Sequence, residues 1–214
     1  KLEDLDIDLG RERSPGTSYI FKGLLHLPML KRFTLQISLI KYEEWIILQN
    51  FVKDQIHLES LALRLFLWLK RQAPRNKSWY IQENLHIENL IKNLQNKPRL
   101  NSLTLKSSAW SLEALSKGFA HLRMKNQLHI LAFEGSDDTV TSQEKAWKRV
   151  KGVCDFIKSQ KESLKVLKVL LPLVFEENVV NHIGEAISQL LNLKELQLLT
   201  NDGWLGQVSN LHQY

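Results

Sequence analysis

Apolar residues recur along the chain in one seven-residue phrase, apolar-x-x-apolar-x-apolar-x. In the clearest copies, as from Leu58 to Leu63 and from Leu100 to Leu105, all three apolar positions are leucine. Alternation of apolar and variable residues predicts a short strand with one buried face. Recurrence of such a strand at a nearly fixed interval predicts a solenoid of stacked units. The seven copies begin at Leu2, Leu30, Leu58, Leu100, Leu128, Leu164 and Leu193, which lie 28, 28, 42, 28, 36 and 29 residues apart.

The segments between the phrases have helical spacing. Ile87, Leu90, Ile91 and Leu94 fall at i, i+3, i+4 and i+7, the pattern of a helix with one apolar stripe. The range 45–56 is also apolar, but its apolar residues do not fall as clearly on one side of a helix. Three further stripes are Leu112, Leu115, Phe119 and Leu122; Ala146, Val150, Val153 and Ile157; and Val180, Ile183, Ile187 and Leu190.

The unit is therefore predicted to run strand, turn, helix and return. Right-handed crossovers of this kind give a parallel sheet with all helices on one side. Neighbouring strands lie about 4.8 Å apart, whereas neighbouring helices need about 8–10 Å. We therefore expect the stack to curve, with the strands on the concave face and the helices on the convex face.

The phrase and its 28-residue period resemble leucine-rich repeats of the ribonuclease-inhibitor-like class. The resemblance covers residues 2–200 and implies a curved α/β leucine-rich-repeat solenoid of about seven repeats. The family pattern places Asn or Cys eight residues after the first leucine, where only Asn201 matches here, so we expect irregular turns. We expect residues 1–214 to form one such domain within a longer chain. Exposed leucines at the two ends of the solenoid would make those ends prone to association.

Residues between the strand leucines should point out of the core and line the concave face. This face changes from acidic, at Asp4, Asp6 and Asp8, through basic and hydroxylic to partly apolar. An exposed apolar end could form a protein interface or be covered by a neighbouring segment of the same protein. The candidate protein-binding residues are Arg32, Gln36, Arg64, Thr104, Lys106, Ile130, Ala132, Val166, Lys168, Leu170, Gln197 and Leu199.

Two insertions interrupt the period, near residues 66–80 and 134–143. The first is basic and contains aromatic residues, a combination that can follow a phosphate backbone and stack on bases. A solvated loop that extends the core explains it as well, and the second, acidic insertion reads as a surface loop. The candidate nucleic-acid contacts, which include a basic helix, are Lys70, Arg71, Arg75, Lys77, Trp79, Lys148 and Arg149.

Composition adds little to this picture. The net charge of +6 permits an acidic partner without requiring one. A single cysteine, Cys154, excludes an internal disulfide and favours an intracellular location, cytoplasmic or nuclear. No stretch is apolar for 18 residues, so no membrane span is expected. We find no catalytic constellation, metal-ligand spacing or phosphate-binding loop, and expect neither enzyme activity nor a cofactor.

The sequence thus favours a non-catalytic protein–protein interaction module, an adaptor or scaffold subunit of a larger assembly with protein partners. A nucleic-acid-associated subunit of a ribonucleoprotein is the first alternative. The second is a substrate- or ligand-recognition region of a larger ubiquitin ligase or receptor. A fold alone cannot choose among these.

Overall fold

The computed structural model describes residues 2–10, 16–27, 29–37, 40–65, 77–136, 143–171, 177–200 and 203–209. Its strands form one eight-stranded sheet in the order of the sequence, β1 to β8. Strands β1 to β7 are parallel, and β8 is antiparallel to β7. The strands are β1 (Asp4–Asp8), β2 (Arg32–Ile37), β3 (Ser60–Leu65), β4 (Ser102–Ser111), β5 (Ile130–Ser136), β6 (Val166–Leu171), β7 (Glu195–Thr200) and β8 (Gly203–Ser209).

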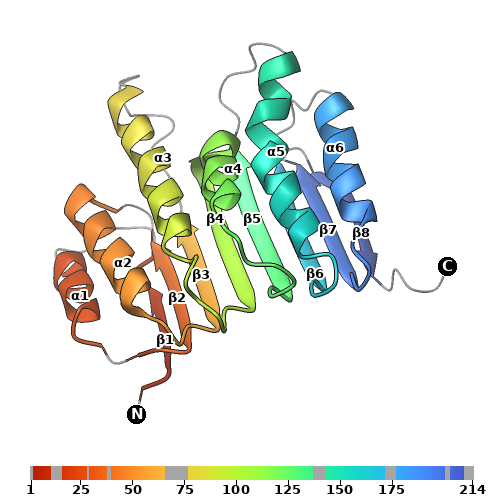
Figure 1. Ribbon diagram of the computed structural model, residues 1–214. Helices are drawn as coiled ribbons and strands as arrows, with labels where there is room; N and C mark the ends of the chain where they lie inside the picture. Colours follow the sequence, from red (N-terminus) through yellow and green to blue (C-terminus); the bar gives the residue numbers. More distant parts are fainter. Residues whose placement is uncertain are drawn as a thin grey trace.

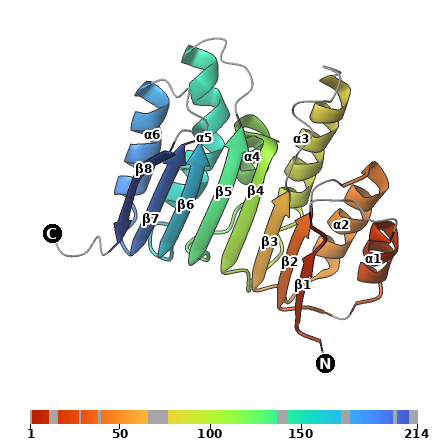
Figure 2. The same cartoon turned by 180° about the vertical axis from the view of Figure 1, so that it is seen from behind.

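One helix separates each pair of consecutive parallel strands. Every helix of the described chain lies on the same side of the sheet, and the opposite side, the helix-free face, carries no helix (Figures 1 and 2). This two-layer arrangement is the leucine-rich-repeat-like α/β architecture that the sequence predicts. The helices are α1 (Thr17–Leu24), α2 (Tyr42–Asp54), α3 (Lys77–Lys92), α4 (Leu112–Ala120), α5 (Gln143–Ser159) and α6 (Glu177–Ser188).

The core lies between the two layers. The phrase leucines of β2 to β6 are buried, and so are the predicted stripes of α3 and α4. In α5, Val150, Val153 and Ile157 are buried as predicted, and Cys154 lies among them. The strand pairing repeats the phrase in register; for example, Leu61 pairs with Leu103.

Two elements were not anticipated from the sequence. Helix α1 buries only Thr17, Phe21 and Leu24, which is too short a stripe to recognise by periodicity. Strand β8 has no leucine phrase and pairs with the edge of β7, so β7 is not the last strand of the sheet. At the other end of the sheet, Leu2 is exposed.

Glutamine side chains form hydrogen bonds with the backbone of the returns, the segments that lead from each helix to the next strand. Gln160 Oε1 accepts hydrogen bonds from the backbone N–H groups of Gln127 and Leu128, each at 2.9 Å. Gln55 Oε1 accepts one from Leu30 N at 2.6 Å. Leu30 and Leu128 each open a phrase, so each glutamine connects the return at the end of a unit to the return that precedes the strand of the same unit. They act at the opposite end of the strands from the Asn or Cys of the family pattern.

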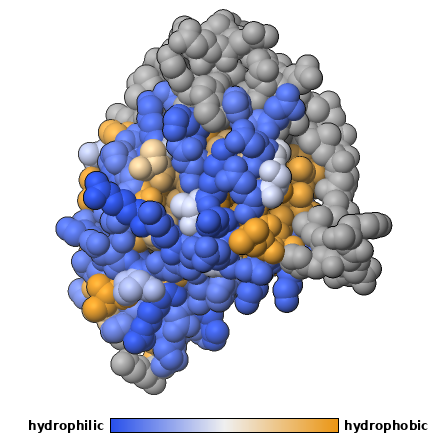
Figure 3. Space-filling view, turned by 45° about the vertical axis from the view of Figure 1, so that its right-hand side comes forward, coloured by the Kyte–Doolittle hydropathy of each residue, from blue (hydrophilic) through white to orange (hydrophobic). Residues whose placement is uncertain are grey.

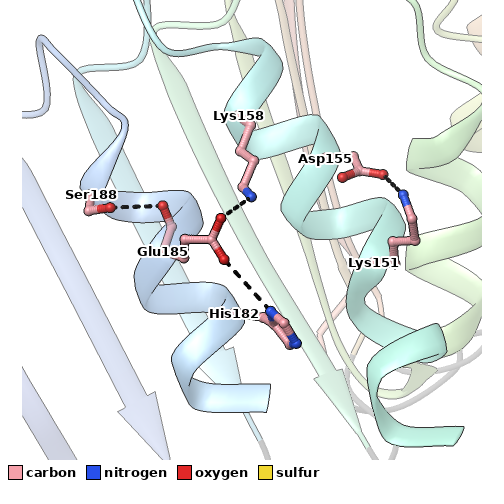
Figure 4. Close-up of polar contacts among 6 residues, drawn as sticks. All are labelled: Lys151, Asp155, Lys158, His182, Glu185 and Ser188. Atoms are coloured by element: carbon pink, nitrogen blue, oxygen red, sulfur yellow. Dashed lines mark hydrogen bonds and ion pairs between the residues drawn. The ribbon is translucent and has the colours of Figure 1, made fainter. Parts of the chain in front are cut away.

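The helices pack closely in the middle of the layer. Gly152 of α5 donates its N–H to Ser116 Oγ of α4 at 2.8 Å. A Cβ at Gly152 would lie 2.1 Å from the backbone oxygen of Ser116, so only glycine permits this approach. Farther along, ion pairs span the helix surface: Lys158 of α5 binds Glu185 of α6 at 2.9 Å, and Lys151 binds Asp155 within α5 (Figure 4).

The outer surface is mainly hydrophilic on the side shown in Figure 3, with apolar residues in separate smaller areas. In the described part of the chain, no helix is both long enough and apolar enough to cross a membrane.

Candidate interaction face

Side chains on the helix-free face stand in three rows, because parallel pairing places equivalent residues of successive strands side by side. All twelve candidate protein-binding residues occupy these rows. The first row is Asp4, Arg32, Ser60, Ser102, Ile130, Val166 and Glu195; the second is Asp6, Thr34, Ala62, Thr104, Ala132, Lys168 and Gln197; the third is Asp8, Gln36, Arg64, Lys106, Glu134, Leu170 and Leu199.

Polar contacts engage two of the three aspartates at the β1 end, and one of the two is an ion pair. Arg32 of β2 binds Asp4 with two hydrogen bonds, Nε to Oδ1 at 2.8 Å and an NH2 group to Oδ2 at 2.5 Å. Its guanidinium lowers the pKa of the Asp4 carboxyl below the ordinary value. Gln36 Nε2 donates to Asp8 Oδ2 at 2.9 Å. Both contacts lie in exposed positions, so water screens them.

The middle of the face carries two cations side by side. Arg64 of β3 and Lys106 of β4 are in register in the third row. Arg64 is exposed and Lys106 half-buried. Neither side chain has an ion pair or hydrogen bond with another described residue. Their neighbours Ala62 and Thr104 in the second row are small, so they leave the two cationic groups accessible to a partner.

The β6–β7 end combines an ion pair with apolar side chains. Lys168 Nζ binds Glu195 Oε1 at 2.8 Å, and Gln197 Nε2 donates to the same oxygen at 2.7 Å. Thus Lys168, a candidate contact residue, already has a carboxylate partner. Sequence alternation places such residues on a face but cannot show which ones pair there, and it gave no signal for Glu195 as the partner.

The apolar candidates differ in accessibility. Ile130 is 38% exposed, and Val166, Leu170 and Leu199 are half-buried. Ala132 is only 3% exposed, although it lies on the helix-free face. It is flanked in register by the longer side chains of Thr104 and Lys168, which explains how a methyl group there can be covered. The expectation of a contact patch that includes an exposed Ala132 is therefore wrong at this residue.

The candidate nucleic-acid contacts are not brought together as a described site. Lys70, Arg71 and Arg75 lie outside the described residues. Lys77 and Trp79 fall in the first turn of α3, and Lys148 and Arg149 fall in α5. For these four residues the structure describes the backbone and not the side chains.

Titratable groups buried in the core lie away from the helix-free face. His86 of α3 stacks on Trp45 of α2, with ring centroids 5.6 Å apart, and burial lowers its pKa. Burial raises the pKa of the Cys154 thiol to about 11, so it is a poor nucleophile near neutral pH. Among the described residues, no group of three or more His, Cys, Asp or Glu side chains is arranged to hold a metal ion.

No protein-family model matches the chain, and no curated protein sequence matches it significantly. The structure is similar to the tropomodulin C-terminal domain of Caenorhabditis elegans, with a TM-score of 0.50 and 15% sequence identity. The similarity covers 80% of this chain and 91% of that one. At this identity it supports the leucine-rich-repeat-like fold and says nothing about a shared activity.

Proposed function

We propose that this chain is a non-catalytic protein–protein interaction module, an adaptor or scaffold subunit of a larger intracellular assembly. In this proposal the chain has about seven repeats of the ribonuclease-inhibitor-like class, and its sheet curves with the helix-free face on the concave side. That face is the binding surface.

The observation that carries the proposal is the composition of the helix-free face. On a sheet face that only contacts water, charged, hydroxylic and apolar side chains could be mixed in any arrangement. On the helix-free face they occupy separate zones from β1 to β7. Protein interfaces combine accessible polar groups with apolar residues in this way. Ile130 supplies an exposed apolar group in the first row of the same face, on the strand next to β4.

Nucleic acid is the weaker partner for this face. A polyanion that followed the strands would meet the carboxylates of Asp6 and Asp8 at one end and Glu195 at the other. Phosphate binding depends on several cations acting together. The alternative of a ribonucleoprotein subunit therefore rests on the basic insertion and on α5, not on the helix-free face.

The test is crosslinking mass spectrometry of the full-length protein purified from the cells that express it, with and without nuclease. We expect protein partners that survive nuclease and crosslink to Lys106 and Lys168. The proposal would be overturned in favour of the ribonucleoprotein hypothesis if the partners were lost with nuclease. Crosslinks confined to Lys70, Lys77 and the lysines of α5 would overturn it in the same way.

A further inference from the structure

Arg64 and Lys106 are unusual among the charged residues of the helix-free face. Arg32 has Asp4 as its partner and Lys168 has Glu195, so two of the four cations of these rows are neutralised within the sheet. Arg64 and Lys106 have no such partner among the described residues. The two of them provide a local positive charge in the centre of the face, next to Glu134 of β5, which is in register with Lys106.

The fold gains nothing from this pair. Like charges that face each other on neighbouring strands destabilise a sheet. Parallel register holds Arg64 and Lys106 next to each other, since both follow the second apolar residue of their phrase by the same offset. An arrangement that works against the stability of the sheet is readily explained if a ligand of opposite charge relieves the repulsion.

The surroundings define the ligand further. Thr104, in the second row, offers a hydroxyl group two residues from Lys106 on the same strand. Ile130 offers an exposed aliphatic side chain on the next strand, in the first row, at the opposite end of the strands from the two cations. Glu134 of β5 is in register with Lys106. On the other side, Asp6 and Asp8 of β1 form an exposed acidic edge. A long polyanion would be repelled at that edge, whereas a short acidic segment would not reach it.

We propose, on the basis of the proposed function, that the helix-free face docks a short acidic segment of a partner protein. Two of its carboxylates bind Arg64 and Lys106. An aliphatic residue of the segment packs on Ile130, and any basic residue lies toward Asp6 and Asp8.

The experiment selects ligands from a displayed library of random 12-residue peptides with the wild-type chain as target. Selected peptides are then synthesised and their affinity is measured by fluorescence anisotropy. We expect enrichment of peptides with two closely spaced acidic residues. Exchange of these two residues for Gln and Asn should weaken binding about tenfold, the loss of two exposed charge-assisted contacts.

Two variants show where the peptide binds. The double substitution Arg64→Gln and Lys106→Gln should weaken binding of the acidic peptide about tenfold, whereas Lys53→Gln with Lys125→Gln, which removes the same charge from exposed positions off this face, should leave it within about twofold. Thr104→Tyr, a bulky residue suited to a strand, should block any ligand of the face.

The outcomes separate this inference from the proposed function. Peptides that are blocked by Thr104→Tyr but lack acidic residues would overturn the acidic-segment inference and leave the helix-free face as a binding surface. Peptides whose binding is unaffected by Thr104→Tyr would contradict both. If the Arg64–Lys106 variant and the Lys53–Lys125 variant lost equal amounts of peptide affinity, net charge alone would explain the effect, and the inference would be overturned.

Discussion

Gln160 Oε1 accepts the backbone N–H groups of both Gln127 and Leu128, while its Nε2 donates to the carbonyl of Met124 at 2.7 Å. One fully buried side chain thus satisfies three backbone groups of the preceding return. Removal of such a partner leaves buried polar groups without hydrogen bonds, which costs more than the bonds themselves contribute.

We therefore predict that Gln160→Ala lowers the free energy of unfolding by about 3 kcal/mol. Chemical denaturation measures this change. Gln95→Ala is the matched control, since Gln95 accepts only one described hydrogen bond, from Arg123 N at 2.7 Å in an exposed position. Water can replace that bond, and the loss should stay below about 1 kcal/mol. Equal losses for the two variants would contradict the role of burial.

Substitution by alanine should have opposite effects on stability at two helical glycines, because of the two only Gly152 lies against a neighbouring helix. Gly152→Ala forces a methyl group against the Ser116 backbone and should destabilise the protein by about 3 kcal/mol. Gly184→Ala, in α6, meets nothing within 4 Å and should stabilise it by about 0.5–1 kcal/mol through helix propensity. Thermal and denaturant unfolding of both variants checks the pair. A neutral Gly152→Ala would show that the helices can separate at no cost.

Lys97 predicts a pH dependence of stability. The side chain is 2% exposed, its Nζ donates to the Lys53 carbonyl at 2.6 Å, and burial lowers its pKa from 10.5 to about 8. Between pH 8 and 10.5 the unfolded chain therefore holds a proton at this lysine that the folded chain has lost. This makes the Lys97 contribution to stability rise with pH across that window.

The rise should reach about 2–3 kcal/mol, and Lys97→Met should abolish it. The quantity to measure is the difference in unfolding free energy between wild type and variant at each pH. A difference is needed because the raised pKa of Cys154 acts in the opposite direction between pH 9 and 11. Lys125→Met, at an exposed lysine, controls for net charge. A constant difference from pH 7.5 to 10.5 would contradict the prediction.

Burial of Cys154 predicts slow thiol chemistry. The side chain is inaccessible and its pKa is about 11, so little thiolate exists at pH 8. Alkylation by iodoacetamide, followed by mass spectrometry, should be at least about 100-fold slower in the folded protein than in urea. Fast modification under native conditions would mean that α5 opens readily.

The sequence predicted the strands well because each strand core has the same three apolar positions. Helices α3 to α6 were equally accessible to this reasoning because their stripes run over several turns. Helix α1 lacks such a stripe, since only Phe21 and Leu24 bury large side chains. Strand β8 lacks the phrase, but Asp202-Gly203 after an apolar strand is a hairpin signal that could have found it.

The polar structure of the protein was harder to foresee. Gln160 and Lys97 belong to residue types that usually lie on the surface, and nothing local marks them as buried. Alternation correctly placed the candidate residues on the helix-free face. It could not show that Ala132 is covered or that Lys168 is paired, because both depend on the side chains of neighbouring strands.

The central claim is that the helix-free face binds a protein partner. Its most direct measurement is quantitative mass spectrometry of partners that co-purify with the full-length protein after nuclease treatment. Wild type and Thr104→Tyr are compared with a control, Lys53→Tyr, at an exposed position of helix α2. We predict that Thr104→Tyr loses most of the partners retained by wild type and by the control. Full retention by Thr104→Tyr, with the variant folded by circular dichroism, would contradict the claim.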